Sequence, residues 1–330
     1  MSAPVCLLVN PSAGGGRGAR RAPGVQRALA ELGIDARRCD TRDLEHAREL
    51  AREGASRGET VAVLSGDGMI GAVADVLREI PGAVLAVLPG GRGNDLARVL
   101  GIPLDPVAAC EVLANGTPRP LDLGEVEGRT FVGIASVGFD SVANRIANEA
   151  PAALGNLVYA YGALRALISW RPARFEIELH PSGERHSFTG YTVGACNSRS
   201  YGGGMQAAPD ALLDDGLLDV LVLEDVSKVT FVTSLLPKVF KGTHASSPHV
   251  HSFRSAEVSI SADRPFSIYA DGDPIARLPA RVRTLPGAVT VLVPAGANPA
   301  FGAEASRPAR AAGPPKADMG LAALERSPEA

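Results

Sequence analysis

Apolar and polar residues alternate in two different patterns along the chain, and the pattern changes near residue 118. Before that point, apolar runs of strand length are separated by stretches in which apolar residues recur at helical spacing. The expected strands lie near residues 4–9, 34–39, 60–64 and 84–88, and the expected helices near 19–32, 43–53, 69–79 and 105–115. A strand–helix alternation of this kind predicts a parallel, doubly wound α/β sheet.

After residue 118, apolar runs follow one another with few helical stretches between them, which predicts a β-rich, mostly antiparallel domain. One helix is expected near 155–169, where apolar residues occur on more than one face. We expect it to pack in the core, with a lipid-access groove along its exposed side as the alternative. From residue 295 the chain is rich in Ala, Pro, Gly and Arg without periodicity, which predicts a disordered tail.

The sequence therefore predicts an α/β domain over residues 1–120, a β-rich domain over 121–294 and a tail over 295–330. The strands of the second domain are expected in short runs up to residue 293. The last of them could pair within its own domain or return to the first.

Three of the expected strands of the first domain run directly into glycine-rich turns. These are Asn10-Pro11-Ser12-Ala13-Gly14, Ser65-Gly66-Asp67-Gly68 and Pro89-Gly90-Gly91-Arg92-Gly93-Asn94-Asp95. Because the carboxyl ends of parallel strands open into one crevice, we expect the three turns to line a ligand site. Glycine lets the backbone approach a phosphate, and a following helix N-terminus favours negative charge. The predicted ligand is a nucleotide or another phosphate ester.

Composition narrows the classes of function. The chain has 330 residues, 45% of them hydrophobic, and a net charge of −3, so no strong field of the whole chain attracts nucleic acid or an acidic membrane. The four cysteines are isolated in the sequence, which argues against a zinc site or a disulfide framework. We see no signal-peptide pattern and no apolar run long enough to cross a membrane, which predicts a cytoplasmic protein.

The second turn also has the Gly66-x-Gly68-x-x-Gly71 spacing of a dinucleotide-binding fingerprint. That fingerprint expects an acidic residue at the end of the next strand, whereas the strand over 84–88 ends in Leu-Pro-Gly-Gly. Asp67 lies between the glycines, where its carboxylate would oppose a pyrophosphate unless a metal ion lay between them. A carboxylate beside a phosphate site favours Mg²⁺-dependent phosphoryl transfer instead.

The three turns, in this order, resemble the signatures of the diacylglycerol kinase catalytic family, which includes bacterial diacylglycerol kinases and is related to sphingosine and ceramide kinases. Further motifs of the second half continue the resemblance, which covers about residues 3–294: Gly202-Gly203-Gly204-Met205, Ala208-Pro209-Asp210-Ala211, Asp214-Asp215-Gly216-Leu217-Leu218-Asp219-Val220, Lys241-Gly242-Thr243-His244 and Asp271-Gly272-Asp273. The resemblance implies an α/β domain similar to that of phosphofructokinase and NAD kinase, followed by a β-rich sandwich domain. The cleft between them would hold ATP, Mg²⁺ and a lipid hydroxyl.

The same resemblance implies which residues bind the cofactors. The implied nucleotide-binding residues are Asn10, Pro11, Ser12, Ala13, Gly14, Thr41, Ser65, Gly66, Asp67, Gly68, Met69, Ile70, Gly71, Ala72, Arg92, Gly93 and Asn94. A structural Mg²⁺ is implied on the Asp215 carboxylate and on the carbonyl groups of Leu212 and Leu217. There it would hold the loop that closes the cleft.

A lipid alcohol is a weak nucleophile and needs a base when it attacks the γ-phosphate, and carboxylates must hold the Mg²⁺. The resemblance places the base in an Asp-Gly-Glu motif, here Asp271-Gly272-Asp273, so either Asp271 or Asp273 is the expected base. Asp67, Asp95 and Asp122 complete the expected metal and hydrogen-bond network. The alternatives are a strand-end cap for Asp122 and the N-cap of a helix over 96–100 for Asp95.

Four positions depart from the family pattern. Met69 replaces a hydroxyl residue, Gly71 and Ala72 replace an amide and a carboxylate, and Arg92 replaces a small residue. We expect nucleotide binding to persist in altered form, with the Arg92 guanidinium able to bind phosphate in place of the lost contacts.

We therefore expect an ATP- and Mg²⁺-dependent kinase that phosphorylates the hydroxyl of a lipid such as diacylglycerol. It would reach this substrate at the membrane surface without a transmembrane segment, without a nucleic-acid partner, and as a monomer or a homodimer. The alternatives are a non-catalytic nucleotide- or lipid-binding relative and a soluble-substrate kinase of the NAD kinase type.

Overall fold

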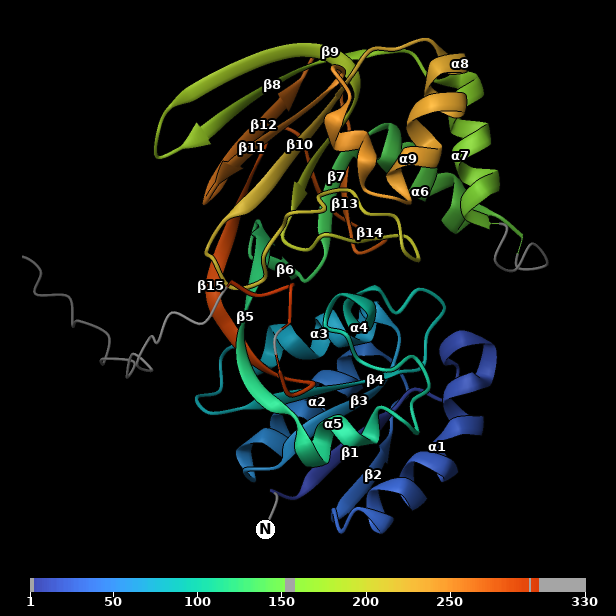
Figure 1. Cartoon of the computed structure of the whole chain (residues 1–330), viewed down its shortest axis with the longest axis vertical. Helices are drawn as coiled ribbons and strands as arrows, with labels where there is room; N and C mark the ends of the chain where they lie inside the picture. Colours follow the sequence, from blue (N-terminus) through green and yellow to red (C-terminus); the bar gives the residue numbers. More distant parts are fainter. Residues whose placement is uncertain (1–2, 152–157, 297, 303–330) are drawn as a thin grey trace, which may run out of the picture.

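The computed structural model describes residues 3–151, 158–296 and 298–302. Figure 1 shows two domains, one above the other, with the long strands β5 and β15 running between them. Within the described ranges, no helix is both long enough and apolar enough to span a bilayer.

A parallel four-stranded sheet forms the centre of the first domain, in the order β4–β3–β1–β2. Its strands are β1 (Val5–Val9), β2 (Ala36–Asp40), β3 (Thr60–Ser65) and β4 (Val84–Pro89). Its helices are α1 (Ala13–Glu31), α2 (Leu44–Ser56), α3 (Asp67–Leu77), α4 (Asp95–Val99) and α5 (Cys110–Asn115). Strands β1 and β3 are almost wholly apolar and buried, as expected for a parallel sheet covered on both faces. The predicted parallel α/β domain is confirmed.

The second domain is built from antiparallel pairs. Its strands are β5 (Thr117–Val126), β6 (Arg129–Phe131), β7 (Ile134–Gly138), β8 (Ala173–His180), β9 (Glu184–Cys196), β10 (Leu218–Glu224), β11 (Val250–Ser255), β12 (Glu257–Ala262), β13 (Ser267–Ala270), β14 (Asp273–Arg277) and β15 (Ala280–Val293). The burial pattern of β8 alternates along the strand, because one side of its sheet faces an apolar core and the other faces water.

Helices cover one side of this β structure (Figure 1). They are α6 (Phe139–Glu149), α7 (Val158–Ser169), and a continuous helical segment made of α8 (Lys228–Thr230), the π-helix η2 (Phe231–Leu235) and α9 (Leu236–Val239). A short 3₁₀ helix, η3 (Thr243–Ser246), follows. A separate apolar cluster that includes Phe139, Trp170, Tyr191 and Phe231 lies between these helices and the strands.

Strand β15 belongs to both halves of the molecule. Its first residues pair antiparallel with β12, and Thr290 and Val291 pair parallel with Val84 and Leu85 of β4. The apolar runs over 281–285 and 288–293 predict two separate strands, but the structure shows one strand with a register shift between Leu285 and Val289. Pro286 and Gly287 lie at this shift, and a bulge of this kind bends a strand without ending it.

Three other predictions are corrected. Helix α6 and the helical segment over 228–239 were not predicted, although Phe139, Val142 and Ile146 of α6 recur at helical spacing. The expected helix over 105–115 begins only at Cys110. The expected tail does not begin at residue 295, since Ala300 and Phe301 are buried and the Ala300 carbonyl accepts a hydrogen bond from the Leu213 N–H. The remainder of the predicted tail, 303–330, lies outside the described residues.

Candidate active site

The three glycine-rich turns lie together at the carboxyl edge of the parallel sheet. An added Cβ on Gly14 would lie 2.8 Å from the Gly90 carbonyl oxygen, and one on Gly66 would lie 3.2 Å from the Gly91 Cα. No larger residue fits these contacts without moving the backbone, which explains why glycine occupies both positions. The structure therefore places the three predicted turns next to one another at the carboxyl edge of the parallel sheet.

The first turn is closed by Asn10, whose Oδ1 accepts hydrogen bonds from the Ser12 N–H at 3.0 Å and the Ser12 hydroxyl at 2.8 Å. The next residues, Gly14 to Gly16, have φ of 58°, 72° and 84°, a conformation that glycine adopts at little cost. The regular part of α1 starts after these glycines, so its amino end points back to the same edge. A helix amino end favours an anion there.

The second turn leads directly into α3, with Gly66 as its N-cap. Met69 is buried, and its Sδ lies 4.0 Å from the Thr41 hydroxyl, which itself donates to the Val9 carbonyl. The Met69 and Thr41 side chains therefore stabilise the turn from inside. Ala72 is also buried, whereas Gly71 faces the second domain, because a Cβ there would lie 3.8 Å from the Asp271 Oδ2.

The third turn is held by Asn94, a left-handed residue with φ of 51°. Its Oδ1 accepts from the Gly91 N–H at 2.8 Å, and its Nδ2 donates to the Gly91 carbonyl at 3.2 Å. Arg92, between them, is exposed. Its guanidinium is thus free to reach a ligand at this edge.

Asp67 and Asp95 converge on the space beside Gly93. An added Cβ on Gly93 would lie 3.1 Å from the Asp95 Oδ2 and 3.4 Å from the Asp67 Oδ2. Asp67 also accepts from the Leu96 N–H at 3.1 Å, so it supplies the hydrogen bond at the start of α4 that was expected of Asp95. The predicted N-cap role of Asp95 is therefore wrong, and the N-cap residue is Asn94.

Asp95 instead joins the two domains. Both of its carboxylate oxygens accept from the Gly203 N–H, at 3.0 and 2.9 Å. Burial raises the pKa of Asp95, and the negative charge of Asp67 raises it further, while the Gly203 N–H opposes the shift. The negative charges of the Asp67 and Asp95 carboxylates repel each other. A divalent cation bound between them would remove this repulsion.

Asp271 faces this pair from the second domain. Its Oδ2 accepts from the Val132 N–H at 2.8 Å, and its Oδ1 accepts from the N–H groups of Gly133 at 2.9 Å and Ile134 at 3.2 Å. Burial raises the pKa of Asp271 to about 6, with a further contribution from the charge of Asp67. A carboxylate with this pKa is ionised at neutral pH, yet more basic than an ordinary aspartate.

These carboxylates line a cleft of about 140 Å³ between the domains. Asp67, Gly93 and Asp95 contribute from the first domain, and Ile134, Tyr201 and Asp271 from the second. Within the part of the chain that the structure describes, none of the three aspartates is paired with an arginine or lysine.

An apolar cavity of about 130 Å³ adjoins the cleft. Ile134, Asn144, Tyr201 and Met205 line both, so they form the wall between the two spaces. The rest of the cavity is lined mainly by apolar side chains, among them Phe139, Leu221, Phe231, Leu235 and Val239. A molecule with a polar end and an apolar chain fits two adjoining spaces of this character.

One acidic residue faces the apolar cavity. Burial raises the pKa of Asp140 to about 6, and the Tyr201 hydroxyl donates to its Oδ2 at 3.4 Å. Asp140 and Asn144 belong to α6, and sequence reasoning missed both because it did not predict this helix. Tyr201 was also missed, although it directly precedes the Gly202-Gly203-Gly204 motif, which was the signal that could have found it.

The structure does not bring two predicted catalytic residues into the cleft. Asp273 is exposed at the start of β14. Asp122 is buried elsewhere, where it accepts from the N–H groups of Gly216 at 2.7 Å and Gly287 at 2.6 Å. Burial raises the pKa of Asp122, and these two N–H groups oppose the shift. These contacts hold two loops, and Asp122 lies in the middle of β5 instead of at the turn or strand end expected as its alternative role.

The arrangement around Asp215 does not fit the implied structural Mg²⁺. The Asp215 Oδ1 accepts from the Leu217 N–H at 2.9 Å, and its Oδ2 is paired with the Arg254 guanidinium. The arginine already supplies the positive charge that a cation would bring there. Among the described residues, no group of three or more Asp, Glu, His and Cys side chains has the geometry of a metal site.

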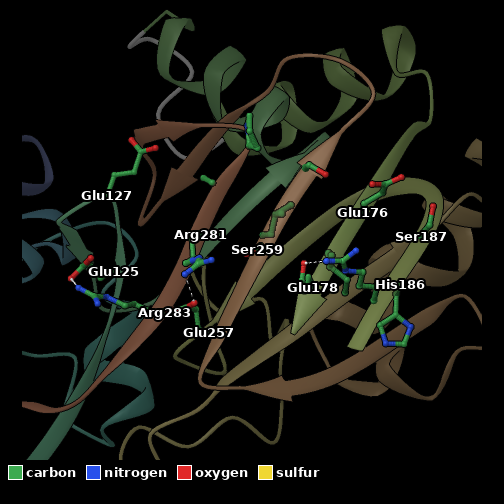
Figure 2. Close-up of a pocket in the computed structure, with 16 residues that line it drawn as sticks. Glu125, Glu127, Glu176, Glu178, His186, Ser187, Glu257, Ser259, Arg281 and Arg283 are labelled. Carbon is green, nitrogen blue, oxygen red and sulfur yellow. Dashed lines mark hydrogen bonds and ion pairs between the residues drawn. The ribbon is translucent and has the colours of Figure 1, made fainter. Parts of the chain in front are cut away.

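A wider groove of about 960 Å³ lies away from the cleft, across the open face of the sheet formed by β8, β12 and β15. Figure 2 shows its charged side chains, many of them in pairs. Arg283 is 2.9 Å from Glu125, Arg281 is 3.1 Å from Glu257, and Arg185 is 3.0 Å from Glu178. None of the predicted site residues lines this groove.

Two family models match the chain. The family model described as "Diacylglycerol kinase catalytic domain" matches residues 4–126, and "YegS C-terminal NAD kinase beta sandwich-like domain" matches residues 133–293. The two matches together cover both domains of the fold.

Relatives match along most of the chain. A "Diacylglycerol kinase" of Mycobacterium tuberculosis is 33% identical over 300 residues, which cover 88% of this chain and 95% of the relative. A "Probable lipid kinase YegS-like" of Pseudomonas aeruginosa is 34% identical over 260 residues, with 76% and 82% covered. A "Diacylglycerol kinase" of Bacillus subtilis is 27% identical over 292 residues, with 87% and 95% covered.

A solved structure of a diacylglycerol kinase from Bacillus anthracis has the same fold. It superposes with a TM-score of 0.70 at 21% identity, covering 89% of this chain and 98% of that one. The two family matches and the sequence relatives show that the chain belongs to the diacylglycerol kinase family of lipid kinases.

Proposed function

We propose that the protein transfers the γ-phosphoryl group of ATP, with Mg²⁺, to the hydroxyl of a lipid such as diacylglycerol. The observation that carries the proposal is the acidic cleft between the domains, which shares a wall with an apolar cavity. The first space suits a phosphate-bound metal and a reacting hydroxyl, and the second suits the chain of a lipid. We place this reaction in the cytoplasm, at the membrane surface.

The nucleotide would lie along the edge formed by the three glycine-rich turns. The amino end of α1 and the exposed Arg92 both favour phosphate there. Met69 does not take part directly, because it is buried under the turn, so the hydroxyl lost at this position is not replaced by its side chain.

Asp67 and Asp95 fit Mg²⁺ bound together with a phosphate. Mg²⁺ prefers oxygen ligands and commonly uses one or two carboxylates plus substrate phosphates. Two carboxylate oxygens converge beside Gly93, in a space that a single Cβ would fill. The metal, when bound, would neutralise negative charge on the transferred phosphate.

Asp271 is the proposed base. Its Oδ2 accepts one backbone hydrogen bond and keeps a lone pair for the proton of the lipid hydroxyl. As that proton moves to Asp271, the lipid oxygen forms a bond to the γ-phosphorus, and the bond from the γ-phosphorus to the β–γ bridging oxygen breaks to leave ADP. The three backbone donors hold the carboxylate in place throughout.

The adjoining cavity favours a lipid over a soluble alcohol. A soluble-substrate kinase of the NAD kinase type has no need for a cavity lined by Phe139, Phe231 and Leu235 beside its reaction site. The departures at Met69 and Arg92 keep the non-catalytic relative as the second candidate, because they alter the nucleotide edge itself.

Transfer of radiolabelled γ-phosphate from ATP and Mg²⁺ into diacylglycerol in mixed micelles tests the proposal. We expect labelled lipid from the wild type and a loss of about 10²- to 10⁴-fold in the Asp271→Asn variant. The matched control is Glu257→Gln, which removes a carboxylate from the groove of Figure 2 and should leave the rate unchanged. ATP binding without label in any lipid would favour the non-catalytic relative, and label in NAD or soluble alcohols alone would favour the soluble-substrate kinase.

A further inference from the structure

Exposed apolar side chains gather on the helices around the apolar cavity. Among the described residues, eight large hydrophobic side chains are exposed; five of them belong to α7 or to the segment from α8 to the end of α9, and a sixth, Phe240, directly follows α9. We call these six the helical apolar face: Tyr161, Leu164, Ile168, Val229, Val232 and Phe240. Single exposed hydrophobic residues are common on proteins, but a concentration of this kind indicates an interaction surface.

These helices are apolar on two sides. Ala163, Phe231 and Leu235 point inward and line the apolar cavity. Leu164 and Ile168 on α7 are 60% and 68% exposed, and Val229 is 71% exposed. A helix that only covers a core shows a polar outer side, so packing against the core does not account for the outer residues.

The two helical segments form one surface. The Lys228 ammonium, at the start of α8, donates to the Ile168 carbonyl oxygen near the end of α7 at 2.8 Å. This contact places Ile168 and Val229 close together. Figure 1 shows α7 beside α8 on the outer side of the second domain, with α9 continuing from the α8 segment.

The charged residues within the two segments themselves all have one sign. Residues 158–172 and 226–249 contain Arg165, Arg171, Lys228, Lys238 and Lys241 and no aspartate or glutamate, in a chain whose net charge is −3. The chain has four lysines in all, and three of them lie between residues 228 and 241. All three are exposed. Lysine ammonium groups above an apolar surface suit the anionic headgroups of phospholipids.

We infer that the helical apolar face is a docking surface for a lipid bilayer that contains anionic phospholipid. Tyr161, Leu164, Ile168, Val229, Val232 and Phe240 would enter the headgroup region, with the three lysines against the phosphates. The same helices wall the apolar cavity, so the docked surface lies next to the space proposed for the lipid chain. The choice of a bilayer as the binding partner rests on the proposed function. The helical apolar face and its lysines are observed independently of that function.

Co-sedimentation of the full chain with vesicles tests the inference. Vesicles of phosphatidylcholine with phosphatidylglycerol should bind the wild type, and the Leu164→Glu/Ile168→Glu variant should bind at least about tenfold more weakly. The matched control is Leu44→Glu/Leu104→Glu, at two exposed leucines of the first domain, which should bind like the wild type. Equal binding by both double variants would overturn the inference.

The lysines are tested separately. Lys228→Gln/Lys238→Gln should weaken binding to the phosphatidylglycerol vesicles by about fivefold per lysine and leave the weak binding to pure phosphatidylcholine unchanged. Equal weakening on both vesicles would contradict a role for the lysines in headgroup recognition.

Two further measurements separate this inference from its alternatives. If Leu164→Glu/Ile168→Glu converts a dimer into a monomer in sedimentation velocity, the face pairs two copies of the chain and the bilayer proposal is wrong. Phosphorylation of a water-soluble short-chain diacylglycerol should be the same in this variant and in the wild type. If no lipid is phosphorylated at all while vesicles still bind the wild type, the proposed kinase function fails and the docking surface stands.

Discussion

Carboxylates line both the groove on the open sheet face and the cleft between the domains, but their partners differ. The groove on the open sheet face is the larger, and Glu125, Glu178 and Glu257 each lie within an ion pair with an arginine. The cleft is the smaller, and its aspartates are held by backbone N–H groups with no basic side chain paired to them among the described residues. Figure 2 shows these three ion pairs, whereas Glu127 and Glu176 have no partner among the residues drawn.

The comparison teaches that size alone does not identify a site. Exposed ion pairs form at little cost and contribute little to stability. Carboxylates buried close together without a counter-ion destabilise the folded state, so a protein keeps them where a ligand, a metal ion or a proton transfer uses them. The four predictions that follow test whether the cleft and the groove differ in this way.

The largest effect is expected from Asp67→Asn. The asparagine Oδ1 can still accept from the Leu96 N–H, so α4 keeps its hydrogen bond while the negative charge is lost. We expect kcat to fall by about 10²-fold or more, because a ligand of the proposed metal is weakened. Steady-state kinetics against Mg²⁺ concentration measure it, with Glu257→Gln in the groove as the control. A variant with wild-type kcat at every Mg²⁺ concentration would remove Asp67 from the metal site.

The next effect concerns stability. Burial raises the pKa of Asp140 to about 6 in the folded state, above the usual value in an unfolded chain. The ionised form therefore destabilises the fold above about pH 6, and this cost disappears below about pH 4, where both states are protonated. Asp140→Asn should increase the free energy of unfolding by about 2 kcal/mol near neutral pH and by nothing in acid.

Urea unfolding at several pH values measures this difference. In the groove, Glu178→Gln removes an exposed ion pair with Arg185 and should change the free energy of unfolding by less than about 1 kcal/mol. A loss of stability in Asp140→Asn at every pH would mean that the hydrogen bond from Tyr201 matters more than the buried charge.

The pH dependence of the reaction is the third test. Because the pKa of Asp271 is raised to about 6, kcat/KM should fall by about tenfold per pH unit below that value as the base becomes protonated. The charge of Asp67 contributes to the raised pKa, so Asp67→Asn should move the acidic limb to lower pH. An acidic limb that stays in place in this variant would show that the two carboxylates are not coupled.

The smallest effect is expected at Arg92. Its side chain is exposed, so a contact with a phosphate would be weakened by water, and Arg92→Thr should reduce ATP affinity by about fivefold. Calorimetric titration with ATP and Mg²⁺ measures it, and Arg281→Thr in the groove is the matched loss of an arginine. Unchanged affinity would take Arg92 out of the nucleotide site.

The sequence predicted the parts of the site that depend on neighbours in the chain. Buried parallel strands followed by glycine turns are local patterns, and their meeting at one edge follows from the rules of parallel sheets. The N-cap of α4 was mispredicted because the acceptor comes from Asp67, in another turn. The sequence did not decide between Asp271 and Asp273 as the base. Asp271 has a left-handed φ of 51°, so the alternation of side chains along a strand does not give the direction of its side chain.

Helix α7 (Val158–Ser169) lies within the predicted range 155–169, but the helical segment over 228–239 could not be predicted, for a different reason. The segment over 228–239 contains Val229, Thr230, Val232 and Thr233, and β-branched residues favour strands. Packing against the apolar cluster around Phe231 overrides that preference and leaves a π-helical turn there. The apolar cavity, which this segment helps to line, therefore could not be predicted from the sequence.

Strand β15 has a consequence for biosynthesis. The edge of β4 is completed by Thr290 and Val291, which leave the ribosome about 200 residues after β4 itself. Until then, the first sheet of the nascent chain has an open edge, which is the kind of surface that associates with other chains. Since residues 280–293 pair with both domains, a single cut of the chain cannot yield two complete halves. Each domain therefore needs the other to complete its fold, although each contributes its own residues to the cleft.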